Sequence, residues 1–94
     1  MKPTPITDFI ITDHAATELK RRDLSEEIIR QVLADPAQQQ DIRRGRIVLQ
    51  SRVLMGESRK EYLIRVFVDV DRAPAEVVTA YRTSKISKYW REES

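Results

Sequence analysis

The alternation of side chains in residues 60–70 constrains the fold of this chain more than any other feature of the sequence. One set of alternate positions is uniformly apolar or aromatic: Tyr62, Ile64, Val66, Val68 and Val70. The other set mixes apolar and charged residues: Leu63, Arg65, Phe67 and Asp69. Because successive side chains of a strand point to opposite faces, one face of this strand belongs to a core and the other is partly polar. The chain must therefore build a sheet with a second layer over the first face.

Three further segments predict strands, and turn residues separate them. The segments are residues 40–43, which form a weak strand, residues 46–54 and residues 76–83. Gly45, residues 56–58 and residues 71–74 mark the turns. In the last strand, we expect Val78 and Ala80 on one side and Val77, Thr79, Tyr81 and Thr83 on the other.

Two short helices are predicted before the strands. Thr12 or Asp13 caps a helix over residues 14–22, and Ser25 caps a second helix over residues 26–34, which Pro36 ends. Residues 1–11 are expected to form a lead-in and residues 84–94 a tail. The face of the sheet that the helices do not cover is expected to be partly open or to be covered by residues 84–90. We predict an α+β fold in which two N-terminal helices pack on one face of a three- or four-stranded antiparallel sheet.

Length and composition indicate one domain over residues 1–94. The chain has 40% hydrophobic and 34% charged residues, which fits a globular domain and excludes a membrane span. It has no cysteine, and residues 1–11 lack the regions of a secretory signal. We therefore expect a cytoplasmic protein without disulfides.

The basic residues gather in the second half of the chain, although the formal net charge is only +2. Arginine predominates among them, and its planar fork suits bidentate contact with phosphate. One interpretation is a solvated surface of mixed charge, and the other is a nucleic-acid face. On the second interpretation the candidate RNA-binding residues are Arg43, Arg44, Arg46, Arg52, Lys85 and Lys88.

Four short motifs occur in an order that resembles a known group of proteins. They are His-Ala at residues 14–15, Arg-x-Leu-Ser at 22–25, Asp-Pro at 35–36 and Thr-Ala-Tyr at 79–81. This pattern, over about residues 10–90, resembles the small bacterial and phage domains related to the RelE and BrnT toxins. The resemblance implies a Barnase-EndoU-colicin-RelE type fold. It also implies a metal-independent endoribonuclease from a type II toxin-antitoxin module, which an acidic antitoxin neutralises.

Four residues are candidates for catalysis of RNA cleavage without a cofactor. His14, the sole histidine, is the candidate for proton transfer, or it only bonds a neighbouring group in the first helical turn. Arg65 is the candidate for binding phosphate, or it only faces solvent from its strand. Thr79 and Tyr81 are candidates for positioning a phosphate or a 2′-hydroxyl, or they reflect ordinary β-propensity.

Other chemistries lack their motifs. The sequence contains no Gly-rich phosphate loop, no metal-ligand spacing and no serine in a nucleophile elbow. A non-catalytic module that binds nucleic acid or protein through the same arginine-rich face is the alternative function, and an oligomer interface is a third. The expected partners are thus RNA and an acidic antitoxin protein, with no membrane, and the oligomeric state stays open.

Overall fold

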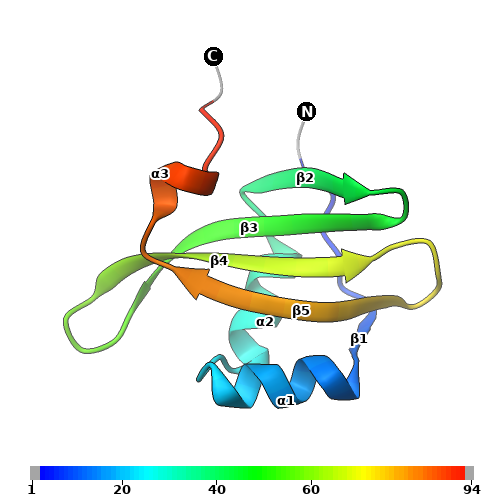
Figure 1. Cartoon of the computed structure of the whole chain (residues 1–94), viewed down its shortest axis with the longest axis horizontal. Helices are drawn as coiled ribbons and strands as arrows, with labels where there is room; N and C mark the ends of the chain where they lie inside the picture. Colours follow the sequence, from blue (N-terminus) through cyan, green and yellow to red (C-terminus); the bar gives the residue numbers. More distant parts are fainter. Residues whose placement is uncertain (1–2, 93–94) are drawn as a thin grey trace.

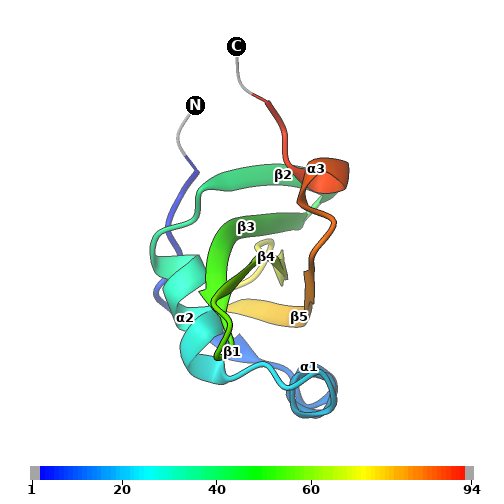
Figure 2. The same cartoon turned by 90° about the vertical axis from the view of Figure 1, so that its left-hand side faces the viewer.

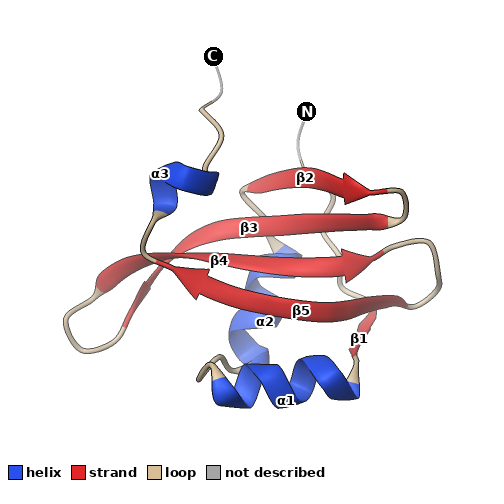
Figure 3. Cartoon of the chain, in the orientation of Figure 1, coloured by secondary structure: helices blue, strands red, loops and turns tan. Residues whose placement is uncertain are grey.

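One five-stranded sheet forms the middle of the computed structural model, which describes residues 3–92 (Figure 1). The elements in chain order are β1 (Phe9–Ile11), α1 (Asp13–Arg21), α2 (Glu26–Ala34), β2 (Gln38–Arg43), β3 (Arg46–Met55), β4 (Lys60–Asp69), β5 (Ala75–Thr83) and α3 (Ile86–Tyr89). The strand order across the sheet is β1-β5-β4-β3-β2. Figure 3 shows that strands make up most of the second half of the chain.

The predicted fold class is wrong in the sheet and in the arrangement of the helices. The sheet has five strands and is mixed, because β1 pairs in parallel with β5 while all other neighbours are antiparallel. A third helix, α3, follows the last strand. The lead-in was expected to lack structure, yet Phe9 pairs with Ala75 and Ile11 with Val77. Residues 1–2 of that lead-in and residues 93–94 of the tail lie outside the described residues.

The two N-terminal helices begin where their capping residues predict. The Thr12 hydroxyl accepts a hydrogen bond from the Ala15 amide at 3.1 Å, and the Ser25 hydroxyl accepts one from the Ile28 amide at 3.2 Å. Each side chain satisfies one of the amide donors that a helix start leaves free. Of the two residues predicted as the cap of the first helix, Thr12 and Asp13, Thr12 is the one observed.

The helices do not form a single pair over one face of the sheet. In Figure 2, α2 lies against one face of β3 and β4, whereas α1 runs beside β5 at the lower edge of the sheet. The buried residues Ile29 and Leu33 of α2 belong to one core cluster with Ile64 and Val66 of β4. Burial of these aliphatic side chains is the main stabilising contribution to the fold.

An irregularity in the β4–β5 ladder changes the predicted face of β5. The register shifts between Phe67 and Val68, so that Val77 lies opposite Val68 while Ala80 lies opposite Val66. Val77 therefore joins Ala80 in the core, where we had expected Val78. Such a shift reverses the alternation of faces along the strand.

The face of the sheet opposite α2 is called the far face, and the C-terminal segment crosses it. Residues 84–92, with α3 in the middle, run along this side of the sheet (Figures 1 and 2). Of the two alternatives predicted for this face, partly open or covered by the C-terminal segment, the second agrees with the described residues. None of the helices within residues 3–92 combines the length and the apolar character that a membrane crossing requires.

Candidate functional site

A row of four polar side chains crosses the far face at one register position of four strands. Gln38 of β2 lies opposite Gln50 of β3, Gln50 opposite Arg65 of β4, and Arg65 opposite Tyr81 of β5. Gln50 donates to the Gln38 amide oxygen at 2.8 Å, and Arg65 Nε donates to the Gln50 amide oxygen at 2.9 Å. Arg65 Nη1 donates to the Tyr81 hydroxyl at 2.7 Å. We call these four residues the polar row.

Arg65 carries a buried positive charge without an acidic partner. Its residue is 6% exposed, and no carboxylate of residues 3–92 forms an ion pair with it. Its hydrogen-bond partners are a neutral amide and a neutral phenol, and three aromatic rings surround its guanidinium carbon. The rings are those of Tyr89 at 4.3 Å, Phe67 at 5.4 Å and Tyr81 at 5.8 Å. Cation–π contact offsets part of the desolvation cost, but the charge remains unneutralised.

One nitrogen of the Arg65 guanidinium is free for a further partner. Nε and Nη1 hold Gln50 and Tyr81, whereas Nη2 has no hydrogen bond to any of the described residues. No buried side-chain polar atom in the described part of the chain lacks a partner, so Nη2 must reach solvent. The geometry therefore leaves one guanidinium edge able to donate to an anion.

Two tyrosines beside Arg65 have hydroxyls with unlike acidities. Burial raises the pKa of Tyr81, and its hydrogen bond with Tyr89 raises it further, against the opposing effect of Arg65. The same hydrogen bond from Tyr81 lowers the pKa of Tyr89, and the charge of Lys88 adds to this effect. The two rings meet edge to face with centroids 6.2 Å apart. Tyr89 is thus the hydroxyl of the pair that loses its proton first as the pH rises, and Tyr81 keeps its proton to higher pH.

The C-terminal segment holds its place over the polar row through its main chain and two rings. Gln50 donates to the Tyr89 carbonyl at 3.2 Å, and Gln38 both donates to the Arg91 carbonyl and accepts from the Arg91 amide. The Trp90 ring lies 4.4 Å from the guanidinium carbon of Arg52, which is on the same face. Tyr89 and Trp90 therefore stack on two neighbouring arginines of the sheet.

His14 and Thr79 belong to a separate group at the edge of β5. The Glu18 carboxylate of α1 lies 3.4 Å from His14 Nε2 and accepts a hydrogen bond from the Thr79 hydroxyl at 2.7 Å. Arg22 donates to Thr79 at 3.1 Å and to Glu18 at 3.2 Å. The hydrogen bond from Thr79, with weaker help from Arg22 and His14, lowers the pKa of Glu18. His14 itself is 77% exposed in its side chain.

The four predicted catalytic residues thus divide into two pairs. The structure brings Arg65 together with Tyr81, and it connects His14 to Thr79 only through Glu18. Within residues 3–92 no hydrogen bond or ion pair joins one pair to the other. The catalytic roles of all four residues remain predictions.

The six predicted RNA-binding cations occupy different surroundings. Arg52 shares the far face with Arg65, and Lys85 and Lys88 are exposed on the C-terminal segment that crosses that face. Arg46 instead binds Asp69 through two hydrogen bonds of 2.6 and 3.1 Å, and these bonds lower the pKa of Asp69. The remaining two, Arg43 and Arg44, are exposed at the β2–β3 hairpin.

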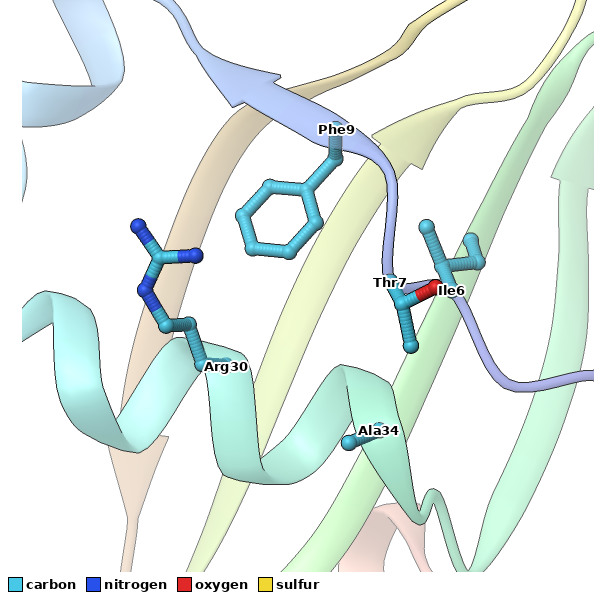
Figure 4. Close-up of a pocket in the computed structure, with 5 residues that line it drawn as sticks. All are labelled: Ile6, Thr7, Phe9, Arg30 and Ala34. Atoms are coloured by element: carbon cyan, nitrogen blue, oxygen red, sulfur yellow. The ribbon is translucent and has the colours of Figure 1, made fainter.

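Neither a metal site nor the pocket in Figure 4 coincides with the polar row. Within residues 3–92 no three His, Cys, Asp or Glu side chains lie close enough to hold a metal ion. The pocket has a volume of about 190 Å³ and is lined by Ile6, Thr7, Phe9, Arg30 and Ala34. Arg30 lies over the Phe9 ring at 5.6 Å from its centroid. This hollow contains none of the predicted site residues.

Three residues of the site were not predicted from the sequence. Gln38 lies before the strand predicted over residues 40–43, although it begins β2 and is 6% exposed. Gln50 is completely buried and interrupts an apolar strand in the same way as Arg65 does, so this interruption was a usable signal. Tyr89 has no such signal, because its position over Arg65 depends on the path of the C-terminal segment.

Comparison with known proteins gives one match. The model of a family described as a domain of unknown function, DUF4258, matches residues 11–82, which include β5 as far as Arg82 and all four residues of the polar row. No curated protein and no solved structure matches the chain significantly.

Proposed function

We propose that this chain, which belongs to the DUF4258 family, binds single-stranded RNA on the far face of its sheet, with a phosphate at Arg65. One observation carries the proposal: the Arg65 guanidinium is 6% exposed and has no carboxylate partner among residues 3–92. A buried cation without an anion is costly, and a bound phosphate would offset that cost. As predicted from the sequence, the partner in this proposal is RNA and the interaction takes place in the cytoplasm.

The chemistry around Arg65 suits a nucleic acid better than an isolated inorganic anion. A phosphate oxygen can accept from Nη2 while Gln50 and Tyr81 hold the guanidinium plane in place. The guanidinium planes of Arg65 and Arg52, on which aromatic rings stack in the structure, supply surfaces on which unpaired bases stack as well. Lys85 and Lys88 add charge that attracts a polyanion.

The proposal is tested by RNA binding with two matched arginine variants. Arg65→Gln should weaken the affinity for a single-stranded oligonucleotide by about tenfold to a hundredfold, since one charge-assisted hydrogen bond contributes about 1.5–3 kcal/mol. Arg82→Gln removes the same charge from the neighbouring strand, at the position directly after Tyr81. Arg82 lies opposite Ile64 of the core and over the Tyr62 ring, on the other face of the sheet. The Arg82→Gln variant should therefore bind RNA with the affinity of the unmutated protein.

Salt dependence separates a phosphate contact from a change in protein stability. The slope of log affinity against log salt should be shallower for Arg65→Gln by about 0.7, the value for one phosphate of a single strand. Equal affinities for Arg65→Gln and Arg82→Gln would refute the proposed site.

Metal-independent RNA cleavage at the same place is a second candidate function. The favouring observation is that the hydroxyls of Tyr89 and Tyr81, both beside Arg65, have pKa values moved in opposite directions. Groups separated in this way suit proton acceptance and proton donation. Tyr89 would take the proton of a 2′-hydroxyl, whose oxygen attacks phosphorus, and Tyr81 would protonate the leaving 5′-oxygen. Arg65 would stabilise the charge of the phosphorane.

Cleavage is tested with a chelator and one conservative variant. The unmutated protein should cut single-stranded RNA in EDTA, leaving a 2′,3′-cyclic phosphate and a 5′-hydroxyl. Tyr89→Phe should lose about a hundredfold in rate while it binds RNA with nearly unchanged affinity. If RNA stays intact after prolonged incubation with the unmutated protein, cleavage is refuted and RNA binding remains as the proposed function.

A toxin role would add an acidic antitoxin as partner, as the resemblance to RelE and BrnT toxins implies. The exposed Lys85, Lys88 and Arg91 beside the polar row favour an acidic segment on this face. Expression of the chain alone should then slow bacterial growth more than expression of Arg65→Gln does. Equal growth of both cultures would count against this role.

A further inference from the structure

The C-terminal segment occupies the surface that the proposed RNA site needs. Tyr89 stacks on Arg65 with 4.3 Å from guanidinium carbon to ring centroid, and Trp90 stacks on Arg52 with 4.4 Å. Arg52 lies opposite Leu63, two residues before Arg65, so the two arginines are diagonal neighbours on one face of the sheet. Two consecutive aromatic residues thus cover two neighbouring guanidinium planes.

The contacts that hold this segment are few, and its helix lends it little support. Helix α3 has four residues, contains no buried residue and has no side-chain hydrogen bond at its N-cap. A helix of this length has little stability of its own. The main attachments are the hydrogen bonds of Gln38 and Gln50 with main-chain atoms, the two stacked rings, and the contact of Tyr89 with Tyr81.

The charge of the segment also opposes its present position. Lys85, Lys88 and Arg91 are exposed on a segment that covers Arg52 and Arg65, so the segment and the surface beneath it both carry positive charges. Such an arrangement is stabilised when an anion enters between them and destabilised when none is present. The rings hold the segment in place against this repulsion.

We infer that the segment of residues 84–92 is an autoinhibitory cover whose Tyr89 and Trp90 rings occupy the stacking positions of two bases of single-stranded RNA. This inference rests on the proposed function. RNA binds by displacing the two rings from Arg65 and Arg52, and the lysines of the segment then follow the phosphates. Duplex RNA, whose bases are already stacked and paired, does not compete with the rings.

The test is a comparison of affinities for a fluorescein-labelled oligouridylate. The double variant Tyr89→Ala, Trp90→Ala keeps every cation but removes both rings, so it should bind about tenfold more tightly than the unmutated protein. The matched control Tyr62→Ala removes a ring that lies over Arg82 and packs against the core on the other side, and its affinity should be unchanged.

The outcomes separate the cover from the proposed function. If the unmutated protein binds the oligonucleotide as tightly as the double variant, or more tightly, the cover is overturned, because the two rings then do not block the site. Absence of binding by every variant, with thermal melts that show folded protein, would overturn the RNA site and the cover with it. Binding by the double variant alone would support both.

A second measurement needs no RNA. Trp90 is the sole tryptophan of the chain, so its fluorescence reports the position of the segment. Tyr89→Ala should raise the acrylamide quenching constant of Trp90 about twofold, since one of the two stacked rings no longer holds the segment. An unchanged constant would show that the segment is fixed by its main-chain bonds and would count against displacement.

Discussion

Replacement of Arg46 should destabilise the fold rather than weaken RNA binding. The Asp69 side chain is 9% exposed and accepts both hydrogen bonds from Arg46, and these bonds are the largest cause of its lowered pKa. Removing one partner of a fully buried ion pair costs about 3–5 kcal/mol. Arg46 is 28% exposed and Arg72 lies 3.9 Å from the other Asp69 oxygen, so solvent and a second cation reduce the loss. We expect Arg46→Met to lower the free energy of unfolding by about 2 kcal/mol.

The sign of the pH dependence follows from the lowered pKa of Asp69. A carboxyl whose pKa is lower in the folded state stabilises the fold above its unfolded pKa of about 3.9, and this stabilisation is lost as the pH falls through the folded value. Arg46→Met should therefore differ from the unmutated protein at pH 7 and approach it in acid below about pH 4. The loss corresponds to a melting temperature lower by about 10 °C at pH 7.

Urea denaturation at pH 7 and in acid measures both effects. Arg44→Met is the control, because Arg44 is exposed on the same hairpin and forms no ion pair among the described residues. It should change the free energy of unfolding by less than about 0.5 kcal/mol. A difference between Arg46→Met and the unmutated protein that stayed constant from pH 7 to acid would refute the role of the Asp69 charge.

Three further perturbations test other parts of the fold. Gly45→Ala should destabilise by about 1–2 kcal/mol in urea denaturation, because Gly45 has a φ of +84° and a Cβ there would lie 2.7 Å from an Asp71 oxygen. Thr79→Val should lower the melting temperature at pH 7, and the difference should shrink in acid, since the Thr79 hydroxyl is the main cause of the lowered pKa of Glu18 and that stabilisation is lost as the pH falls below 4.5. Leu33→Ala should cost about 2–5 kcal/mol of unfolding free energy, because Leu33 is completely buried in the core cluster.

Helix starts and the faces of a strand depend on residues close together in the sequence, and these features were predicted from local sequence patterns. Thr12 and Ser25 cap helices with their own hydroxyls, so the starts of α1 and α2 are encoded within a few residues. The alternation in β4 likewise predicted that Arg65 faces away from the core formed by Ile64 and Val66. The same alternation was sufficient to predict that Arg65 lies beside Tyr81.

Features that depend on distant partners were not predictable in the same way. Residues 9–11 form a strand only because β5 offers them an edge, and nothing in three residues identifies that partner. The register shift near Val68 moved Val77 into the core for a reason that lies in the pairing rather than in the sequence pattern of β5. A shared catalytic site required His14 to lie within reach of Arg65, but α1 runs beside β5, and His14 lies next to Glu18 instead.

The parallel pairing of β1 with β5 has a consequence for the order of events during synthesis. Phe9 is synthesised well before its partner Ala75, because β2, β3 and β4 lie between them in the sequence. Because synthesis adds about 5–20 residues per second, β1 waits seconds for the edge that it joins. Closing so long a loop is also a slow step with a large entropic cost. A nascent chain that stops before β5 therefore lacks a partner for β1, and its exposed β4 edge is the place where premature association with another chain would begin.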